Sequence, residues 1–370
     1  MQATARPLLS TAALGVALLL CAGLLDAEPL YVPGAACVLL AAGAAAWVLG
    51  GARGLRVSRE VDRRRVVEDE PVRMVIAVRS PRMLPTGGVL DDLLPEPWPL
   101  AAGRRRSEAS FDVRFGRRGR KRLAAPRVAV RDPFGLLTRI VRDPAVAAAE
   151  VLVLPRVEPV AAAPAAAGAD GRSLALRRGT PPAAEAEIDG VRPLREGTPA
   201  SRLYWPSLAK GGDLLERHLR ADSDTRPLLV LDPRGAAAEE DLDAAVRATA
   251  SLAVELARHG GCAVLLPGER RPAALEPSLA TWPQLHARLA LIRGDEVPAT
   301  APLAGRRGPV VFVSARRLTR PPRALGHAPG GGRILVVPAA IPGRRVAFTV
   351  AGCWGHEVSA PRRATAGAAA

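Results

Sequence analysis

Residues 8–49 read LLSTAALGVALLLCAGLLDAEPLYVPGAACVLLAAGAAAWVL, and this stretch decides how the chain is organised. It contains two apolar segments without a charged residue, 18 residues at positions 8–25 and 20 residues at positions 30–49. A helix needs about 20 apolar residues to cross the hydrocarbon core of a bilayer. Only residues 26–29 separate the segments, so their near ends must emerge on the same side. Residues 1–50 are therefore predicted to form two transmembrane helices in an antiparallel hairpin.

The charges that flank this stretch predict its orientation. Arg6 precedes the first segment, and six arginines lie between positions 53 and 65, after the second. Because positively charged flanks stay in the cytoplasm, the N-terminus and the long C-terminal part are expected there. The chain is thus predicted to be a multi-pass protein of the inner (cytoplasmic) membrane, with cytoplasmic soluble domains and the lipid bilayer as a partner.

Two alternative interpretations apply to the apolar stretch. A secretory signal peptide fits Arg6, the leucine-rich core and the small residue Ala27, but the second segment and its arginines would still hold the remainder in the membrane. A pair of buried helices in a soluble protein is the other alternative. It fits less well, because both segments are apolar around their whole circumference rather than along one stripe.

The composition predicts folded domains with a strong positive charge. Of 370 residues, 48% are hydrophobic and 24% are charged, which suffices to bury a core, and the formal net charge is +16. Residues 51–150 hold 21 Arg and 1 Lys against 13 acids, a net charge of +9. The basic runs at 104–106 and 117–122 either bind phosphate groups or are solvated strand and turn residues. An aromatic content of 3% argues against nucleic acid as a partner.

Residues 51–158 are predicted to form an all-β sandwich next to the membrane. Short runs of strand-forming residues, separated by turn residues, occur at 72–78, 111–115, 128–130 and 151–154. This spacing is typical of sandwiches. Residues 159–186 are rich in Ala, Pro and Gly and are predicted to be a linker, because such a composition cannot pack a core.

Residues 187–358 change to an alternation of strands and helices. Apolar runs typical of buried strands occur at 227–231, 263–266, 309–313, 334–337 and 346–350. Apolar residues spaced by three and four predict helices at 239–259 and 282–292. The alternation predicts an α/β domain with a mostly parallel sheet. Residues 359–370 are predicted to be a disordered tail, and the whole chain is expected to be an α+β multi-domain protein.

Two segments resemble motifs of a known family. The first is FGRRGR at residues 115–120, followed by RDPFGLL at 131–137. The second is IDGVRPLREGTPASRLYWPSLAKGGDLLERHL at residues 188–219. Both resemble the motifs of the bacterial membrane proteins grouped as the domain of unknown function 58 family, and the resemblance covers most of residues 50–350.

This resemblance implies a von Willebrand factor A-like fold for residues 187–358. Family members look like adaptors encoded beside MoxR-type AAA+ ATPases and transglutaminase-like membrane proteins, which are therefore the expected partners. The chain departs from the family's signature at Thr198, Tyr204 and Lys210, which stand where the family has an acid, a histidine and an arginine. Any role of that acid and histidine is not carried over.

The DPFGL segment is predicted to be structural rather than catalytic. Asp132 is expected to cap the turn that Pro133 pre-sets. Phe134 is expected to anchor into the sandwich. Gly135 permits a backbone geometry that is closed to other residues.

The segment 188–219 is predicted to bind a partner. The candidate residues are Arg192, Gly197, Arg202, Trp205 and Ser207, which match the family's signature, and Lys210, which stands at the position of the family's arginine. Arg202 and Lys210 flank Trp205, so the cations can hold a carboxylate or an anionic tail while the indole serves as an anchor. Alternatively, Trp205 fills the interface between the two domains and the cations make surface pairs.

The first strand of the α/β domain ends in Asp232-Pro233-Arg234-Gly235-Ala236. A metal-dependent adhesion site of the von Willebrand type needs Asp-x-Ser-x-Ser there, because hard oxygen ligands suit Mg²⁺. Both serines are absent and Arg234 brings a cation, so the site is degenerate and no metal or other cofactor is expected. Asp232 is instead expected to cap the strand end or to pair with Arg234.

No enzyme signature is found in the sequence. Its five histidines are scattered, and the motifs of zinc proteases, nucleophile elbows and phosphate loops are missing. Cys353 lies near His356, where a packed thiol is the simpler interpretation. The sequence therefore predicts a non-catalytic, membrane-anchored scaffold that presents a partner to an ATPase. The alternatives are a binder of anionic lipid or nucleic acid through the basic sandwich, and a residual metal-dependent adhesion module.

Overall fold

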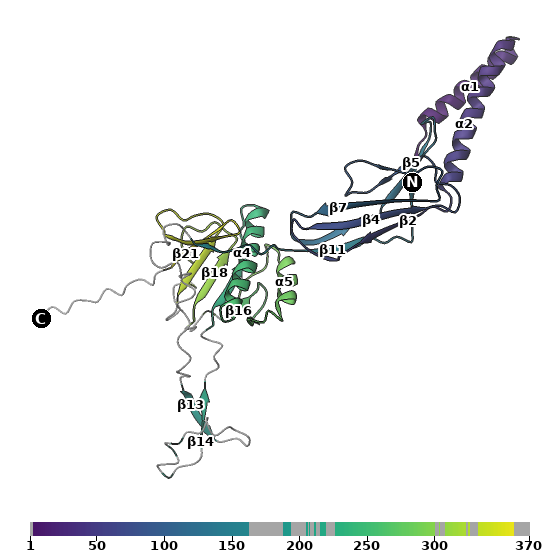
Figure 1. Ribbon diagram of the computed structural model, residues 1–370. Helices are drawn as coiled ribbons and strands as arrows, with labels where there is room; N and C mark the ends of the chain where they lie inside the picture. Colours follow the sequence, from purple (N-terminus) through teal and green to yellow (C-terminus); the bar gives the residue numbers. More distant parts are fainter. Residues whose placement is uncertain are drawn as a thin grey trace. The chain divides into compact units, whose positions relative to one another are not determined.

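The chain folds into two compact units, Met1–Val153 and Leu154–Ala370, which are drawn in the computed structural model of Figure 1. The structure describes residues 3–162, 188–193, 205, 207, 211, 215–219, 226–299, 303, 308–322, 325 and 332–358. Most of the predicted linker and all of the predicted tail, 359–370, lie outside these residues. The division between the units falls at Val153, a few residues before the predicted start of the linker.

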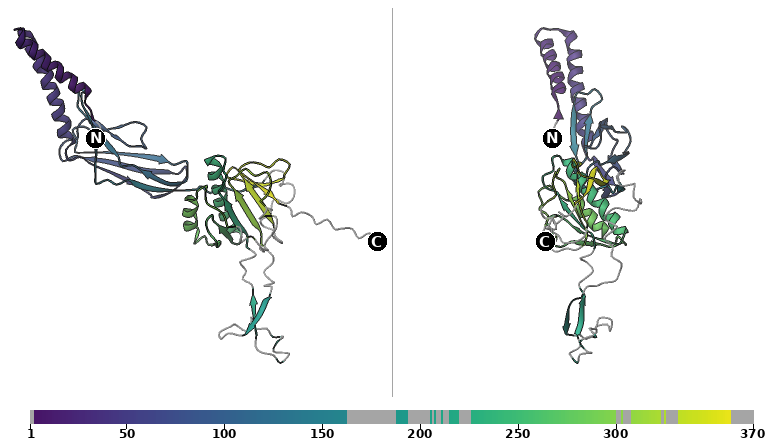
Figure 2. Two further views of the ribbon diagram at one scale, coloured as in Figure 1. Left: turned by 180° about the vertical axis from the view of Figure 1, so that it is seen from behind. Right: turned by 90° about the vertical axis from the view of Figure 1, so that its left-hand side faces the viewer.

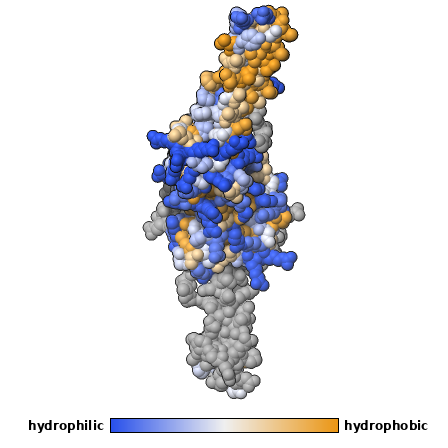
Figure 3. All heavy atoms as spheres, turned by 90° about the vertical axis from the view of Figure 1, so that its right-hand side faces the viewer, coloured by the Kyte–Doolittle hydropathy of each residue, from blue (hydrophilic) through white to orange (hydrophobic). Residues whose placement is uncertain are grey.

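The N-terminal stretch forms the predicted pair of helices. α1 spans Arg6–Leu24 and α2 spans Tyr31–Ala52, and the short 3-10 helix η1, Glu28–Leu30, joins them. The helices run side by side (Figure 1, Figure 2), and hydrophobic atoms gather over them in Figure 3. Both are long and apolar enough to cross a membrane, and only 11% and 22% of their most apolar windows are buried. A core helix of a soluble protein is mostly buried, so this exposure argues against a soluble helix pair.

Small residues let α1 and α2 approach each other closely. A Cβ added at Gly15 would lie 2.9 Å from both the Cβ of Cys37 and the carbonyl oxygen of Gly34. A Cβ added at Gly34 would lie 2.9 Å from Cγ of Leu19. Membrane helices associate through such close packing, because the hydrophobic effect does not drive helices together within lipid.

Residues 56–154, all of which the structure describes, contain strands and no helix. The strands are β2 Arg56–Val61, β3 Arg65–Val67, β4 Pro71–Arg79, β5 Gly87–Leu90, β6 Trp98–Pro99, β7 Arg106–Arg114, β8 Gly119–Leu123, β9 Arg127–Arg131, β10 Thr138–Arg142 and β11 Ala149–Leu154. A further short strand, β1 Ala3–Thr4, precedes α1 and pairs with β10. The three sheets have the orders β2-β4-β7, β3-β11-β8 and β1-β10-β9-β5-β6. The predicted all-β character of this part is confirmed.

Strand β4 supplies the core of this part. Its alternate residues Val72, Met74, Ile76 and Val78 lie on one face of the sheet β2-β4-β7. The first two cluster with buried residues of β3, β8 and β11, and the last two cluster with those of β5 and β9. One face of this sheet is thus covered by both other sheets, which is the layered arrangement of a sandwich.

The C-terminal end of α2 shares a buried cluster with the sandwich. Val48 in the last turns of α2 is 0% exposed, and Leu55 just beyond the helix is 5% exposed. Both cluster with Val89 of β5 and Val128 of β9, and α2 also contacts β10. Because one core holds both parts, the sandwich stands directly at one end of the two helices.

The second unit is built on an eight-stranded sheet in the order β12-β20-β21-β19-β18-β15-β16-β17. Its strands are β12 Ala161–Ala162, β15 Leu228–Asp232, β16 Cys262–Leu265, β17 Ala273–Leu275, β18 Val310–Ser314, β19 Arg333–Val337, β20 Val346–Val350 and β21 Cys353–Glu357. The neighbours β19, β18, β15 and β16 pair in parallel, and the four remaining pairings are antiparallel. The sheet is therefore mixed, and the prediction of a mostly parallel sheet is not confirmed.

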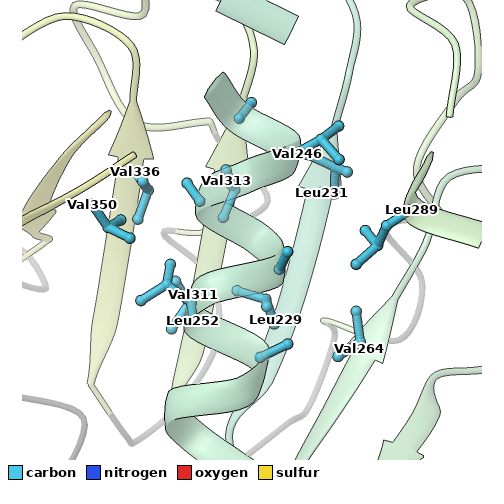
Figure 4. Packing of buried hydrophobic residues seen from close by; sticks show 14 of the residues in the cluster. Leu229, Leu231, Val246, Leu252, Val264, Leu289, Val311, Val313, Val336 and Val350 are labelled. Carbon is cyan, nitrogen blue, oxygen red and sulfur yellow. The ribbon is translucent and has the colours of Figure 1, made fainter. Parts of the chain in front are cut away.

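Helices α4, Glu239–Arg258, and α5, Trp282–Ala290, pack on one face of this sheet. Figure 4 shows Leu229 and Leu231 of β15 beside Val246 and Leu252 of α4. The intervening residues of β15 belong to a second buried cluster, which lies on the opposite face with Leu303 and others. The central strands are thus buried on both faces, as their continuous apolar runs predict.

Candidate functional site

The carboxyl ends of the parallel strands form the edge at which α/β sheets usually bind ligands. From β15 the chain crosses through α4 to β16 on one side, and it later returns to β18 on the other side of β15. The strand order therefore reverses between β15 and β18, and such a switch point is the usual position of a crevice. Asp232 and Ser314 end these two strands and are register partners.

At this edge Asp232 is held by Arg234. Oδ1 of Asp232 accepts hydrogen bonds from Nε of Arg234 at 2.9 Å and from its backbone N–H at 3.2 Å. Oδ2 accepts from Nη2 at 3.1 Å, so the pair is a two-pronged fork. The hydrogen bonds to Asp232 raise the pKa of Arg234 above its usual value. The predicted pairing of these two residues is confirmed, and it also caps the strand end.

A second arginine engages the other carboxylate at this edge. Asp241 lies in the first turn of α4, and its two oxygens accept hydrogen bonds from Nε and Nη2 of Arg317, both at 3.2 Å. The hydroxyl of Ser314 accepts a hydrogen bond from the backbone N–H of Arg316 at 3.1 Å. The carboxylates of Asp232 and Asp241 at this edge are therefore already paired with arginines. Among the described residues, no group of three or more His, Cys, Asp or Glu side chains could hold a metal ion.

The predicted partner-binding segment contains a small sheet of its own. β13, Ile188–Pro193, pairs antiparallel with β14, Leu215–Leu219, and Arg192 is the register partner of Glu216. Trp205 is 52% exposed, and Ser207 is half-buried. The other three candidate residues, Gly197, Arg202 and Lys210, lie outside the described residues, so the structure does not test whether the set comes together.

The DPFGL turn joins β9 to β10 and is held by Asp132. The side chain of Asp132 accepts hydrogen bonds from the backbone N–H groups of Phe134 at 2.8 Å and Leu137 at 2.5 Å. Gly135 has a φ of +73°, which side-chain-bearing residues rarely adopt. The predicted roles of Asp132 and Gly135 are confirmed.

The predicted anchoring of Phe134 is wrong. Its side chain is 68% exposed, whereas Leu137 is 9% exposed and belongs to the sandwich core. The backbone N–H of Phe134 is drawn to the buried carboxylate of Asp132, and the ring is left on the outside of the turn. The leucine at the end of the motif is thus the anchor.

Sequence reasoning missed a buried ion pair in the sandwich and the cavity beside it. Nη1 of Arg59 donates to Oδ2 of Asp91 at 2.9 Å, and Nη2 donates to the carbonyl oxygen of Leu123 at 2.9 Å. Both charged side chains are at most 2% exposed, and Nε of Arg59 is buried without a hydrogen-bond partner. A cavity of about 280 Å³ adjoins the pair and is also lined by basic side chains of β8. No local pattern connects positions so far apart in the chain.

Cys353 and His356 do not form a nucleophile pair. They are three residues apart on β21, and side chains at such positions point to opposite faces of a sheet. Burial raises the pKa of the Cys353 thiol to about 12, so the thiol stays protonated. Burial also lowers the pKa of His356, whose Nε2 accepts a hydrogen bond from the backbone N–H of Ile341 at 3.3 Å. Both side chains are packing residues.

Comparison with known proteins adds no relative to these observations. No family model matches the sequence, and a search of characterised proteins finds no match.

Proposed function

We propose that the chain is a membrane-anchored, non-catalytic scaffold that presents a protein partner to a MoxR-type AAA+ ATPase. In this proposal α1 and α2 form a multi-pass anchor in the inner membrane, and both soluble units face the cytoplasm. The second unit is a von Willebrand factor A-like module, and the segment 188–219 is its docking element. A transglutaminase-like membrane protein is the second expected partner, by the same resemblance to the domain of unknown function 58 family.

The observation that carries this proposal is the exposure of Trp205 in a segment with its own small sheet. The side chain is 52% exposed, and β13 and β14 form a two-stranded sheet apart from the large one. Tryptophan is usually highly buried, and exposed tryptophans are frequent anchors of protein interfaces. Arg202 and Lys210, which flank Trp205 in the sequence, suit an acidic partner.

The chemistry of the large sheet supports binding rather than catalysis. Asp232 and Asp241 are each held in a fork by an arginine. Cys353 is protonated and buried, and His356 points to the opposite face of its strand. These groups lack the paired nucleophile and base that covalent catalysis requires.

A purification of the full-length protein from membranes tests the proposal. The wild-type chain is expected to retain a AAA+ ATPase, and the double variant Trp205→Ala, Arg202→Ala is expected to lose it. Loss of a central tryptophan anchor typically costs about 2 kcal/mol or more, which weakens binding by about 30-fold. The matched control is Trp354→Ala, which removes another exposed tryptophan, 37% exposed, from β21.

Two results would contradict the proposal. If the wild-type chain retains no ATPase, the scaffold role is wrong. If the ATPase persists with the double variant, the segment 188–219 is not the docking element.

A further inference from the structure

Two loops of the sandwich lie against the helical hairpin. Residues 80–86 join β4 to β5, and a Cβ added at Gly51, in the last turn of α2, would lie 2.7 Å from the Cβ of Pro85. The DPFGL turn, residues 132–137, lies beside the start of α1, because Thr4 pairs with Thr138 and α1 begins two residues after Thr4. We call the surface formed by these two loops the hairpin-facing end of the sandwich.

Each of these loops exposes a large apolar side chain. Met83 in the first loop is 69% exposed, and Phe134 in the second is 68% exposed. Exposed apolar groups that lie together next to an apolar anchor mark a surface that is covered in the working protein. The side chains of the hairpin-facing end are therefore expected to have an apolar environment.

The packing of α1 against α2 places this surface at the level of the membrane boundary. Gly15 lies against Gly34 and Cys37. The helices are antiparallel, so Arg6, nine residues before Gly15, lies at the level of the residues about nine positions after Gly34 and Cys37. This level is close to Trp47. Trp47 is 48% exposed. Arginine and tryptophan at one level of a helical hairpin are typical of the interface between acyl chains and headgroups. The DPFGL turn, beside the start of α1, reaches the same level.

The hairpin-facing end also carries exposed arginines. Arg104 and Arg105 belong to this end, because their carbonyl oxygens accept hydrogen bonds from the backbone N–H groups of Leu84, at 2.7 Å, and Ser80, at 3.0 Å. The exposed arginines of the hairpin-facing end include Arg6, Arg53, Arg82, Arg104, Arg105 and Arg131. Among the described residues, none of these six has an acidic partner within 4.0 Å.

Some arginines elsewhere on the sandwich do have acidic partners. Arg63 lies in the loop after β2 and forms ion pairs with Asp62 at 3.4 Å and Glu70 at 3.1 Å. Arg120 of β8 pairs with Glu150 at 3.6 Å. The six arginines of the hairpin-facing end have no such partner among the described residues, so they are available to an anionic ligand.

We infer that the hairpin-facing end binds anionic lipid of the bilayer that holds α1 and α2. Phe134 inserts at the boundary of the acyl chains, Met83 lies in the headgroup layer, and the six arginines bind lipid phosphates. Insertion removes apolar surface from water, and guanidinium groups match phosphates with two parallel hydrogen bonds. This inference rests on the membrane anchoring in the proposed function, and it is independent of the ATPase.

The depth of single nitroxide labels in vesicles tests the insertion. The full-length chain, with Cys21 and Cys37 replaced by alanine, carries a label at Phe134→Cys, Met83→Cys, Arg64→Cys or Leu20→Cys. Arg64 is exposed at the opposite end of the sandwich, and Leu20 is a 60% exposed residue of α1. In phosphatidylcholine vesicles with phosphatidylglycerol, the labels at 134 and 83 are expected to be several-fold less accessible to an aqueous nickel reagent than the label at 64.

The four labels separate the failure of this inference from the failure of the anchor. If the label at Leu20 is shielded while those at 134 and 83 are as accessible as the label at 64, the hairpin-facing end does not bind lipid, and the anchor stands. If the label at Leu20 is also accessible, the membrane anchor itself is wrong, and this inference falls with it.

Selectivity for lipid headgroups tests the arginines without changing an apolar side chain. Spin-labelled phosphatidylglycerol and phosphatidylcholine report how strongly the full-length protein prefers the anionic lipid. The double variant Arg104→Gln, Arg105→Gln is expected to lose most of that preference, since each arginine near an anionic surface strengthens binding about fivefold. The matched control Arg64→Gln, Arg65→Gln removes the same charge from the opposite end and keeps the preference. Equal preference in both double variants would overturn the assignment of the arginines.

Discussion

The carboxylate of Asp132 shows how one buried charge can fix a turn. The residue is 1% exposed, and burial alone would raise the pKa of its carboxyl group. Hydrogen bonds from the backbone N–H groups of Leu137, Leu136 and Phe134 outweigh this effect, so the pKa lies below its ordinary value of 3.8. The ionised form is therefore the one that stabilises the turn between β9 and β10.

Replacement of Asp132 by asparagine should destabilise the first unit. Both carboxylate oxygens accept hydrogen bonds from backbone N–H groups, and in Asn one of them is replaced by an NH₂ group that cannot accept. The lost hydrogen bond lowers the free energy of unfolding by about 1–3 kcal/mol. The melting temperature of the full-length protein in detergent should fall at pH 7. Asp62→Asn, at a carboxylate whose side chain is 59% exposed, should leave the melting temperature nearly unchanged.

The pH dependence of this difference follows from the direction of the pKa shift. Because the folded-state pKa is depressed, the stabilisation is fully present above the unfolded pKa, near 3.8, and is lost as the pH falls through the lower folded value. The wild-type protein and Asp132→Asn should therefore converge in melting temperature below pH 3.8. A difference that stays constant at acid pH would show that the charge is not the cause.

At the level of whole elements, α1 and α2 depend on two glycines that face each other. Gly15→Leu should separate the helices, because a Cβ there meets three atoms at 2.9 Å. Overpacking of this kind destabilises the packed state of the two helices by about 1–3 kcal/mol. Gly43→Leu is the matched control, since a Cβ at Gly43 meets nothing within 4 Å. Nitroxides at the exposed positions Leu14 and Leu39 should show a longer and broader distance distribution in Gly15→Leu alone.

The predictability of the elements follows from how local their signals are. The apolar runs of α1 and α2 and the helical spacing of α4 involve neighbours along the chain, so residue patterns locate these helices to within a few positions. The strand predicted at 72–78 lies inside β4, Pro71–Arg79, and that at 346–350 coincides with β20. These strands are continuous apolar or alternating runs.

Strand β21 and the order of the large sheet could not be read from local patterns. β21 reads CWGHE, which contains a glycine and a histidine and lacks the usual strand composition. It is inserted between β20 and β19, where a Cβ added at Gly355 would lie 2.5 Å from the ring of Phe348. Only the tertiary packing of that ring explains the glycine. β21 contributes two of the four antiparallel pairings that make the sheet mixed.

The candidate sites show the same division between local and distant information. The caps at Asp132 and Asp232 join residues at most five positions apart, and the sequence predicts both. The pair joins Arg59 of β2 to Asp91, just after the end of β5, and had no local signal. The arginines of the hairpin-facing end come from five separate segments, so their convergence becomes visible only in the folded chain.

For the molecule as a whole, the apolar stretch and the distribution of charge point to one arrangement. Two helices long enough to cross a membrane are followed by a basic sandwich that shares their core. In the proposed topology, the six arginines of the hairpin-facing end face a cytoplasmic leaflet, whose negative surface potential attracts positive charge. The positive-inside rule and the exposed arginines thus favour the same side for the sandwich.

Thiol labelling in intact cells tests this orientation. In a chain with Cys21 and Cys37 replaced by alanine, a membrane-impermeant maleimide should label Glu28→Cys, in the exposed connection between α1 and α2, without permeabilisation. Arg64→Cys, exposed on the sandwich, should react only after the membrane is opened. Labelling of Arg64→Cys in intact cells would place the sandwich outside.

A signal peptide removed after Ala27 would shorten the mature chain at its N-terminus, which the intact mass reveals. The hairpin with its shared core would then not exist in the mature protein.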